Sequence, residues 1–512
     1  MDYADWEGFE AHLNAIRRKV AGQFEQVFGA PQEDQSNHPL SGLCGLPAEV
    51  ALGRLDELGY ADSGAALDRL LALRGGSRYA ALPAVNKTAL DGLLPPLIEV
   101  AARQPNPDAT LARILTLLET VSRRAPYLLL LREYPQTLTQ VARIVGASPW
   151  AAQYLTNQPH LLDELLDPRN LMATPDWSLK RDELKATLAN FDGDLERQMD
   201  ELRHFKQSET FRLLAQDLAG MWTLEHLSDQ LAALADLLLA QTLELVWADL
   251  PRKHRDRPAF AVIAYGKLGG KELGYASDLD IVFLYDDPHP DAQDLYARLG
   301  KRMNTWMSTM TGAGILYETD LRLRPDGASG LLVSSVEAFD DYQHHHAWTW
   351  EHQAITRARY ACGDVAVGER FAAIRDAILR LPRDRDKLRA EVLEMRRKMH
   401  DGHPNVSGLF DLKHDAGGLV DVEFAMQYLI LAHSARHPEL TANRGNIALL
   451  GTVGELGLIP TEIAAAAADA YRALRRRQHQ AKLQGAEHAR LAKEEMTGEI
   501  AAVGALWHAV FT

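Results

Sequence analysis

Apolar residues recur at intervals of three and four positions along most of the first half of the chain. This spacing places them on one face of an α-helix. Prolines between positions 105 and 159 divide the sequence into short segments, because proline begins or ends a helix. We therefore predict that residues 1–250 form a helical scaffold or linker region, which could also grip a protein partner. The clearest apolar stripe runs through Leu224, Leu227, Leu231, Leu234, Leu238 and Leu245.

The pattern changes near residue 251, after a polar, proline-bounded loop. The short apolar runs AFAVIAYG and IVFLYDD are typical of buried strands, and a helical pattern follows them. The run ILYETDLRLRP alternates, which predicts a third strand. One face of that strand would carry Ile315, Tyr317, Thr319, Leu321 and Leu323, and the other Glu318, Asp320, Arg322 and Arg324.

Helical periodicity returns beyond residue 366, and the Ala-rich tail after Pro460 favours helix strongly. The chain therefore divides into a helical region (1–250), a small α/β domain (251–365) and a C-terminal helical bundle (366–512). The predicted fold class is α+β, mostly α-helical, with one small mixed β-sheet between helical regions.

Charge and cysteine content narrow the class of protein. The 512 residues carry a formal net charge of −15, which argues against a long nucleic acid as partner, because a polyanion needs a basic track. Only Cys44 and Cys362 occur, as expected in a reducing compartment. No signal peptide and no uninterrupted apolar run of about 18–20 residues is visible. We expect a soluble, cytoplasmic protein without a membrane partner.

The stretch GGKELGYASDLDIVFLYDD carries the candidate chemistry. Asp278 and Asp280 are two positions apart at a strand end and so point to one side. Asp320, on the charged face of the third predicted strand, is a candidate third carboxylate. Converging carboxylates repel one another unless a cation joins them, and magnesium prefers oxygen ligands. An isolated Asp-x-Asp is more often a solvated strand end, but Gly269, Gly270 and Ser277 precede it, and such residues can approach phosphate oxygens closely.

The same residues resemble a known family. YGKLGGKELGYASDLDIVFLY, LYETDLRLRPDGASGLLVSSVEAFDDYQ, AWTWEHQAITRARYACGD and FDLKHDAGGLVDVEF together are similar to glutamine synthetase adenylyltransferase, of the nucleotidyltransferase superfamily. That family has two such halves. One attaches AMP to a tyrosine of glutamine synthetase, and the other removes it by phosphorolysis. This chain is more similar to the C-terminal, adenylylating half.

The resemblance also implies roles for individual residues. Asp278, Asp280 and Asp320 would hold Mg²⁺, or Mn²⁺ in its place, and Asp320 would also take the proton of the attacking tyrosine. ATP would be the substrate, with Gly269, Gly270 and Ser277 on its phosphates. Glutamine synthetase would be the protein substrate, the PII signal protein a partner, and glutamine an effector.

Several alternatives stay open. Arg322 and Arg324 fit a triphosphate contact or salt bridges to nearby acids equally well. The chain could instead be the phosphorolytic, deadenylylating half, or a regulatory module that binds PII and glutamine synthetase. A small-molecule or RNA nucleotidyltransferase is a further reading, although the negative charge disfavours RNA.

Structural roles compete with functional ones at other residues of these motifs. Lys267 and Glu272 fit a role in shaping the turn as well as one in the chemistry. Within FDLKHDAGGLVDVEF, the residues Lys413, Asp421 and Glu423 are interpreted as mainly structural. The sequence also predicts that Trp348 and Trp350 pack in the core.

Overall fold

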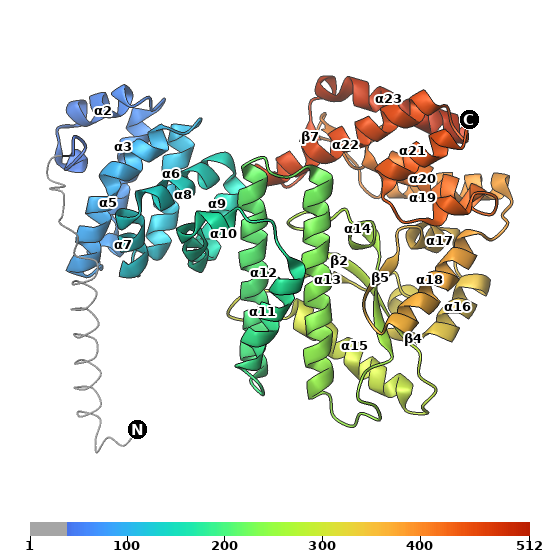
Figure 1. Cartoon of the computed structure of the whole chain (residues 1–512). Helices are drawn as coiled ribbons and strands as arrows, with labels where there is room; N and C mark the ends of the chain where they lie inside the picture. The colour runs from blue at the N-terminus through green and yellow to red at the C-terminus, as the bar shows by residue number, and fades with distance from the viewer. Residues whose placement is uncertain (1–37) are drawn as a thin grey trace, which may run out of the picture. The chain divides into compact units, whose positions relative to one another are not determined.

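The computed structural model describes residues 38–512, and the first 37 residues of the predicted helical region lie outside this range. The contacts divide the chain into two compact units, Met1–Gly146 (unit 1) and Ala147–Thr512 (unit 2). The described part of unit 1 is helical (Figure 1). Prolines begin several of its helices, as predicted, because the first helical position needs no backbone N–H donor. The helices are α2 (Ala48–Glu57), α3 (Ser63–Gly75), α4 (Ser77–Ala80), α5 (Ala84–Ala102), α6 (Pro107–Val121), α7 (Ala125–Glu133) and α8 (Pro135–Ala147).

Unit 2 begins with helices and then forms the mixed sheet. The three long helices before the sheet are α11 (Trp177–Ala189), α12 (Leu195–Leu218) and α13 (Leu224–Asp249), after the shorter α9 (Pro149–Asn157) and α10 (Pro168–Leu171). The five strands are β1 (Phe260–Ala264), β2 (Leu279–Tyr285), β3 (Thr319–Asp320), β4 (Val333–Ser335) and β5 (Arg359–Gly363). Their order is β3-β2-β1-β5, and β4 also pairs with β2. β1 is antiparallel to β2 and β5, whereas β2 is parallel to β3 and β4. The predicted mixed sheet and α+β class are confirmed.

Helices cover both faces of this sheet, which explains why β1 is apolar at every position. Ala261 and Ile263 belong to a core with the helices after residue 336, whereas Phe260 and Val262 belong to a core with α11, α12, α13 and α15 (Ala292–Ser308). Figure 1 shows α13 and α15 on one side of β2 and β5, and α16 and α18 on the other. The helices of the first core are α16 (Val336–His345), α17 (Thr349–Ile355), α18 (Val365–Leu379), α19 (Arg385–Asp401), α20 (Leu419–His433), α21 (Asn446–Glu455), α22 (Thr461–Leu483) and α23 (Thr497–Phe511).

Two predictions from the sequence pattern are wrong. The third strand contains only Thr319 and Asp320, because the chain turns where the Asp320 carboxylate accepts a hydrogen bond from the Arg322 backbone N–H at 2.8 Å. The indole of Trp348 is not in the core: this residue is 70 % exposed, and Trp350 is 37 % exposed. The two tryptophans of this segment therefore do not indicate a buried position.

Helix α13 is the one helix of the described chain that is long and apolar enough to cross a membrane. Most of its apolar window is buried inside the protein, where Leu231, Leu234 and Leu238 pack in the core on one face of the sheet. A helix at the centre of a globular core meets the same length and composition test, and the burial of α13 fits that role.

Candidate active site

The three predicted carboxylates lie at the same end of two neighbouring strands. Asp278 comes directly before β2, and the parallel pairing of β2 with β3 sets Asp280 opposite Asp320. Burial, together with the negative charges of Asp278 and Asp320, raises the pKa of Asp280 to about 6. The negative charges of two neighbouring carboxylates therefore act on Asp280, as the sequence predicted for three carboxylates that converge.

Asp320 is also held by a neighbouring cation. The Arg322 guanidinium donates to both carboxylate oxygens of Asp320, with Nε at 3.0 and 2.9 Å. These hydrogen bonds lower the pKa of Asp320. The side chain of Arg322 is 79 % exposed, so its salt bridge with Asp320 lies at the protein surface. Arg322 thus makes the salt bridge that the sequence analysis weighed against a triphosphate contact.

The donor set fits a hard divalent cation that shares its ligands with a substrate. Among residues 38–512, no three or more His, Cys, Asp or Glu side chains are grouped closely enough to hold a metal ion by themselves. Magnesium, however, is usually held by one or two carboxylates together with water and substrate phosphates. Asp278 and Asp280 supply that number, and the raised pKa of Asp280 marks a site where a cation would relieve repulsion.

Gly266 is a site residue that the sequence analysis missed. Its φ of +51° is unfavourable for residues with a side chain, and a Cβ there would lie 2.0 Å from Oδ2 of Asp280. The neighbouring Tyr265 N–H donates to the Asp280 carbonyl at 2.8 Å. The backbone of the turn α14 (Gly266–Gly269) therefore lies directly against the Asp280 carboxylate.

The predicted phosphate-binding residues have local structural contacts. A Cβ on Gly269 would lie 2.1 Å from the Arg357 carbonyl oxygen, and one on Gly270 would lie 2.7 Å from the Arg357 guanidinium. These two glycines thus allow the turn to pack against the segment before β5. The Ser277 hydroxyl accepts a hydrogen bond from the Gly274 N–H at 3.0 Å and so closes the loop before Asp278. Contact of these residues with ATP stays a prediction.

Arg324 stabilises the loop that follows Asp320. Its guanidinium donates to three carbonyl oxygens of that loop, those of Leu321 (2.6 Å), Ala328 (3.1 Å) and Gly330 (3.3 Å). Arg322 has the larger effect in lowering the pKa of Asp320, against burial, which raises it, and the positive charge of Arg324 lowers this pKa further. Arg324 thus uses three of its five N–H donors within the protein, and its contact with a triphosphate stays a prediction.

A buried ionic cluster joins the turn of the Gly-Gly motif to the C-terminal helices. Glu272 forms ion pairs with Arg357 and, at 3.6 Å, with Arg475 of α22. The Tyr471 hydroxyl donates to Glu272 at 2.9 Å, and the Arg357 guanidinium also pairs with Glu423 of α20 at 3.1 Å. Burial alone would raise the pKa of Glu272, but the two arginines outweigh it and the pKa is lowered. Glu272 and Glu423 thus connect three segments far apart in the sequence.

Asp421 takes a different partner from Glu423, as expected for residues two apart on a helix. Its carboxylate pairs with the buried Arg396 of α19 at 2.6 Å and accepts a hydrogen bond from the Gly417 N–H at 2.7 Å. These contacts fix the loop before α20 to α19. The structural interpretation of Asp421 agrees with these contacts.

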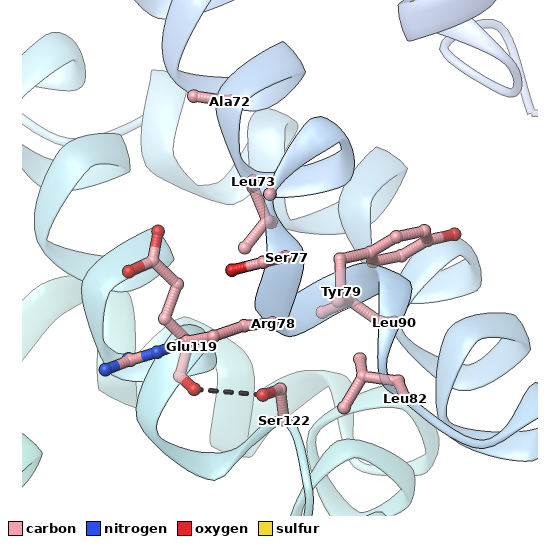
Figure 2. A pocket seen from close by; sticks show the side chains of 10 residues that line it. Ala72, Leu73, Ser77, Arg78, Tyr79, Leu82, Leu90, Glu119 and Ser122 are labelled. Carbon is pink, nitrogen blue, oxygen red and sulfur yellow. Dashed lines mark hydrogen bonds between the residues drawn. The ribbon is translucent and has the colours of Figure 1, made fainter.

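Two cavities of similar size occur in different parts of the chain. One, of about 280 Å³, lies beside the loop before Asp278 and includes Lys267, Ser277 and Lys413 in its lining. The other, of about 240 Å³, lies in unit 1 (Figure 2), with Arg78 and Glu119 on one side and Tyr79 on the other. Beside this second cavity the Ser122 hydroxyl donates to the Glu119 carbonyl at 2.9 Å. Of these two cavities, only the first has a lining residue, Ser277, that is next to Asp278 in the sequence.

Comparisons with known proteins match two family models to the chain. The model described as glutamate-ammonia ligase adenylyltransferase matches residues 138–374, which include the whole mixed sheet and the carboxylates. The model described as GlnD PII-uridylyltransferase matches residues 386–504, which include α20, α21 and α22. The two matches together leave the helices before residue 138 outside both.

Curated relatives resemble the whole chain. The chain is 56 % identical over 484 residues to the Chromobacterium violaceum protein, with 94 % of this chain and 54 % of that protein covered. It is 55 % identical over 513 residues to the Aromatoleum aromaticum protein (100 % and 54 %), and 48 % identical over 518 residues to the Neisseria meningitidis protein (100 % and 57 %). Each bears the name bifunctional glutamine synthetase adenylyltransferase/adenylyl-removing enzyme. The chain spans about half the length of these relatives. On this similarity and on the family match, the chain belongs to the glutamate-ammonia ligase adenylyltransferase family.

Proposed function

We propose that this chain is the adenylylating half of such an enzyme and transfers AMP from ATP to a tyrosine hydroxyl of glutamine synthetase. The observation that carries the proposal is the parallel β2–β3 pair, which sets Asp280 beside Asp320, with Asp278 two positions earlier at the same strand end. A cluster of acids at one strand end suits a nucleotide whose phosphates arrive with a divalent cation.

In this proposal, Asp278 and Asp280 hold Mg²⁺ or Mn²⁺, which would supply positive charge to the phosphates. Asp320 takes the proton of the substrate tyrosine, whose pKa is about 10 in water. The tyrosine oxygen forms a bond to the α-phosphorus, and the bond to the α–β bridging oxygen breaks. Pyrophosphate leaves with the electron pair. Because Arg322 lowers the pKa of Asp320 and so weakens it as a base, the proposal requires this exposed arginine to turn away as the tyrosine enters.

The regulatory partners are a second part of the proposal. The match of residues 386–504 to a PII-uridylyltransferase model supports the PII signal protein as a partner of the C-terminal helices. Glutamine as effector rests on the family resemblance. Since all these partners are cytoplasmic proteins or metabolites, we place the chain in the cytoplasm.

Transfer is tested by incubating the chain with unmodified glutamine synthetase, magnesium and ATP labelled on the α-phosphate. We expect label on glutamine synthetase with the native chain and none with the double variant Asp278→Asn/Asp280→Asn. The matched control is Asp386→Asn/Asp401→Asn, which removes two charges from exposed positions on α19, where these side chains are 91 % and 69 % exposed. This control should transfer AMP at the native rate.

Two results would contradict the proposal. Full transfer by the Asp278→Asn/Asp280→Asn variant would remove the carboxylates from the chemistry. No transfer by the native chain, together with phosphate-dependent release of label from adenylylated glutamine synthetase, would assign the chain to the phosphorolytic half.

A further inference from the structure

The cavity beside the Gly-Gly loop is lined from two sides. One wall is the loop from Glu272 to Ser277, which ends at Asp278, and the other comes from α22 and the segment around Lys413. Its volume is about 280 Å³. Lys267, in the turn α14, belongs to the same lining. The cavity therefore borders the loop and the turn that lead into the carboxylate site.

Two of the five basic residues that line this cavity already have acidic partners. Arg475 pairs with Glu272 at 3.6 Å, and His479 contacts Asp217 at 2.8 Å. The positive charge of Arg475 is thus largely neutralised within the protein.

Lys267 and Lys413 differ from these cations. Within the described part of the chain, neither ammonium group has a hydrogen-bond or ion-pair partner. The acids that act on Lys267 are Glu423 and Asp278, both beyond ion-pair distance, and Lys413 acts on it as a like charge. Two ammonium groups that repel each other therefore line one cavity without an ion-pair partner within 4 Å among the described residues.

The backbone that carries Lys413 is fixed in place. The Asp411 carboxylate accepts hydrogen bonds from the Lys413 and His414 N–H groups, both at 3.0 Å. The Lys413 carbonyl in turn accepts from the Val420 N–H at 3.1 Å, and the Asp411 carboxylate also binds Arg490 at 3.1 Å. The exposed side chain of Lys413 thus projects from a rigid turn, as expected of a side chain that positions a ligand.

We propose that Lys267 and Lys413 bind the β- and γ-phosphates of ATP, and then the pyrophosphate that leaves, in this cavity. The inference rests on the adenylyl transfer proposed above. It adds Lys267, for which the sequence left a turn-shaping and a chemical role open, and Lys413, which was interpreted as mainly structural. The position of Lys267 supports it, since Lys267 and Lys413 line one cavity together with Ser277, the residue before Asp278.

The chemistry of the step explains why positive charge is useful at this point. When the bond from the α-phosphorus to the bridging oxygen breaks, that oxygen keeps the electron pair and the charge on pyrophosphate grows. Unpartnered ammonium groups that already face the leaving group stabilise this charge without reorganising during the reaction. AMP has no outer phosphates, so its binding should be indifferent to these lysines.

Isothermal titration calorimetry of the full chain tests this difference, with inorganic pyrophosphate and AMP as separate probes at one fixed magnesium concentration. Lys413→Met should raise the Kd for pyrophosphate about 10- to 100-fold, the range for loss of a charged hydrogen bond, and leave the Kd for AMP unchanged. Lys413→Arg should restore most of the pyrophosphate affinity. The matched control is Lys398→Met, which removes an exposed lysine of α19 that pairs with Glu394 at 2.7 Å.

The inference is overturned if Lys413→Met binds pyrophosphate as tightly as Lys398→Met does, or if it loses AMP and pyrophosphate equally. It is also overturned if orthophosphate binds as tightly as pyrophosphate, since the cavity would then suit the phosphate of a phosphorolytic reaction. These titrations need no glutamine synthetase. If pyrophosphate binding depends on Lys413 but the chain transfers no AMP, this inference is supported and the proposed function fails. If the chain transfers AMP but Lys413→Met leaves the Kd for pyrophosphate unchanged, the proposed function is supported and this inference fails.

Discussion

Replacing Gly266 by alanine should damage the carboxylate site while leaving the fold intact. The added Cβ would lie 2.0 Å from Oδ2 of Asp280, whereas ordinary contact begins at 3.4 Å. The carboxylate or the turn must therefore move by about 1.4 Å. A misplacement of about 1 Å in a catalytic group costs on the order of 100-fold in rate. We thus expect kcat/KM for AMP transfer to fall by about 100-fold or more.

The same substitution also carries a backbone cost that has nothing to do with Asp280. Gly266 has a φ of +51°, and alanine in the left-handed region costs about 1 kcal/mol. Gly457, which follows α21, has a φ of +65°, and a Cβ added there would meet no atom within 4 Å. Gly457→Ala therefore carries the backbone cost alone.

The assay compares these two variants in AMP transfer and in urea unfolding. Both should lose about 1 kcal/mol in the free energy of unfolding, but only Gly266→Ala should lose transfer. Equal transfer by the two variants would refute the reasoning, because the Asp280 carboxylate would then tolerate the displacement. A loss of several kcal/mol by Gly266→Ala alone would show that the turn, and not the carboxylate, absorbs the clash.

Three further outcomes follow from the site. Arg322→Gln removes the guanidinium that lowers the pKa of Asp320. The pKa of Asp320 should therefore rise, and the acid limb of the kcat/KM–pH profile should move to higher pH. An acid limb that does not move would exclude Asp320 as the base. Removal of divalent cations with EDTA should abolish labelling, which added Mg²⁺ or Mn²⁺ restores, without change in the circular dichroism spectrum. Tyr471→Phe deletes the hydroxyl that donates to Glu272 and Glu423, and should lower the free energy of unfolding by about 1 kcal/mol; an unchanged urea midpoint would contradict that.

The sequence predicted those features that depend on local periodicity. The buried strands β1 and β2 and the helices around them follow from runs of apolar residues. The placement of Asp278 and Asp280 on the same side follows from strand geometry, because residues two apart in a strand point the same way. The approach of Asp320 was predicted from its charged neighbours, although the strand there contains only two residues. Leu321 and Leu323, which were predicted on one face of that strand, pack against cores on opposite faces of the sheet. The alternating pattern there therefore belongs to a loop that contacts both cores.

Other features depend on partners distant in the sequence and leave no local signal. Gly266 resembles any glycine in a turn until the Asp280 carboxylate is placed against it. Glu272 meets Tyr471 across 199 positions of the chain. A glycine two residues after the end of a buried strand could have marked Gly266, since such a position often needs a positive φ, but the Gly-Gly pair was the stronger signal.

The contacts of Glu272 explain why the sheet and the C-terminal helices form one compact unit. Burying a carboxylate is costly unless cations and donors surround it, and the partners of Glu272 come from the segment before β5 and from α22. The apolar core on one face of the sheet likewise extends through the helices from residue 336 to residue 511. Without α20 and α22, the loop before Asp278 would keep a buried charge with fewer partners, and the cavity that Lys267 lines would lose the wall that α22 forms. The geometry at Asp278 and Asp280 therefore depends on the C-terminal helices as much as on the strands that carry these residues.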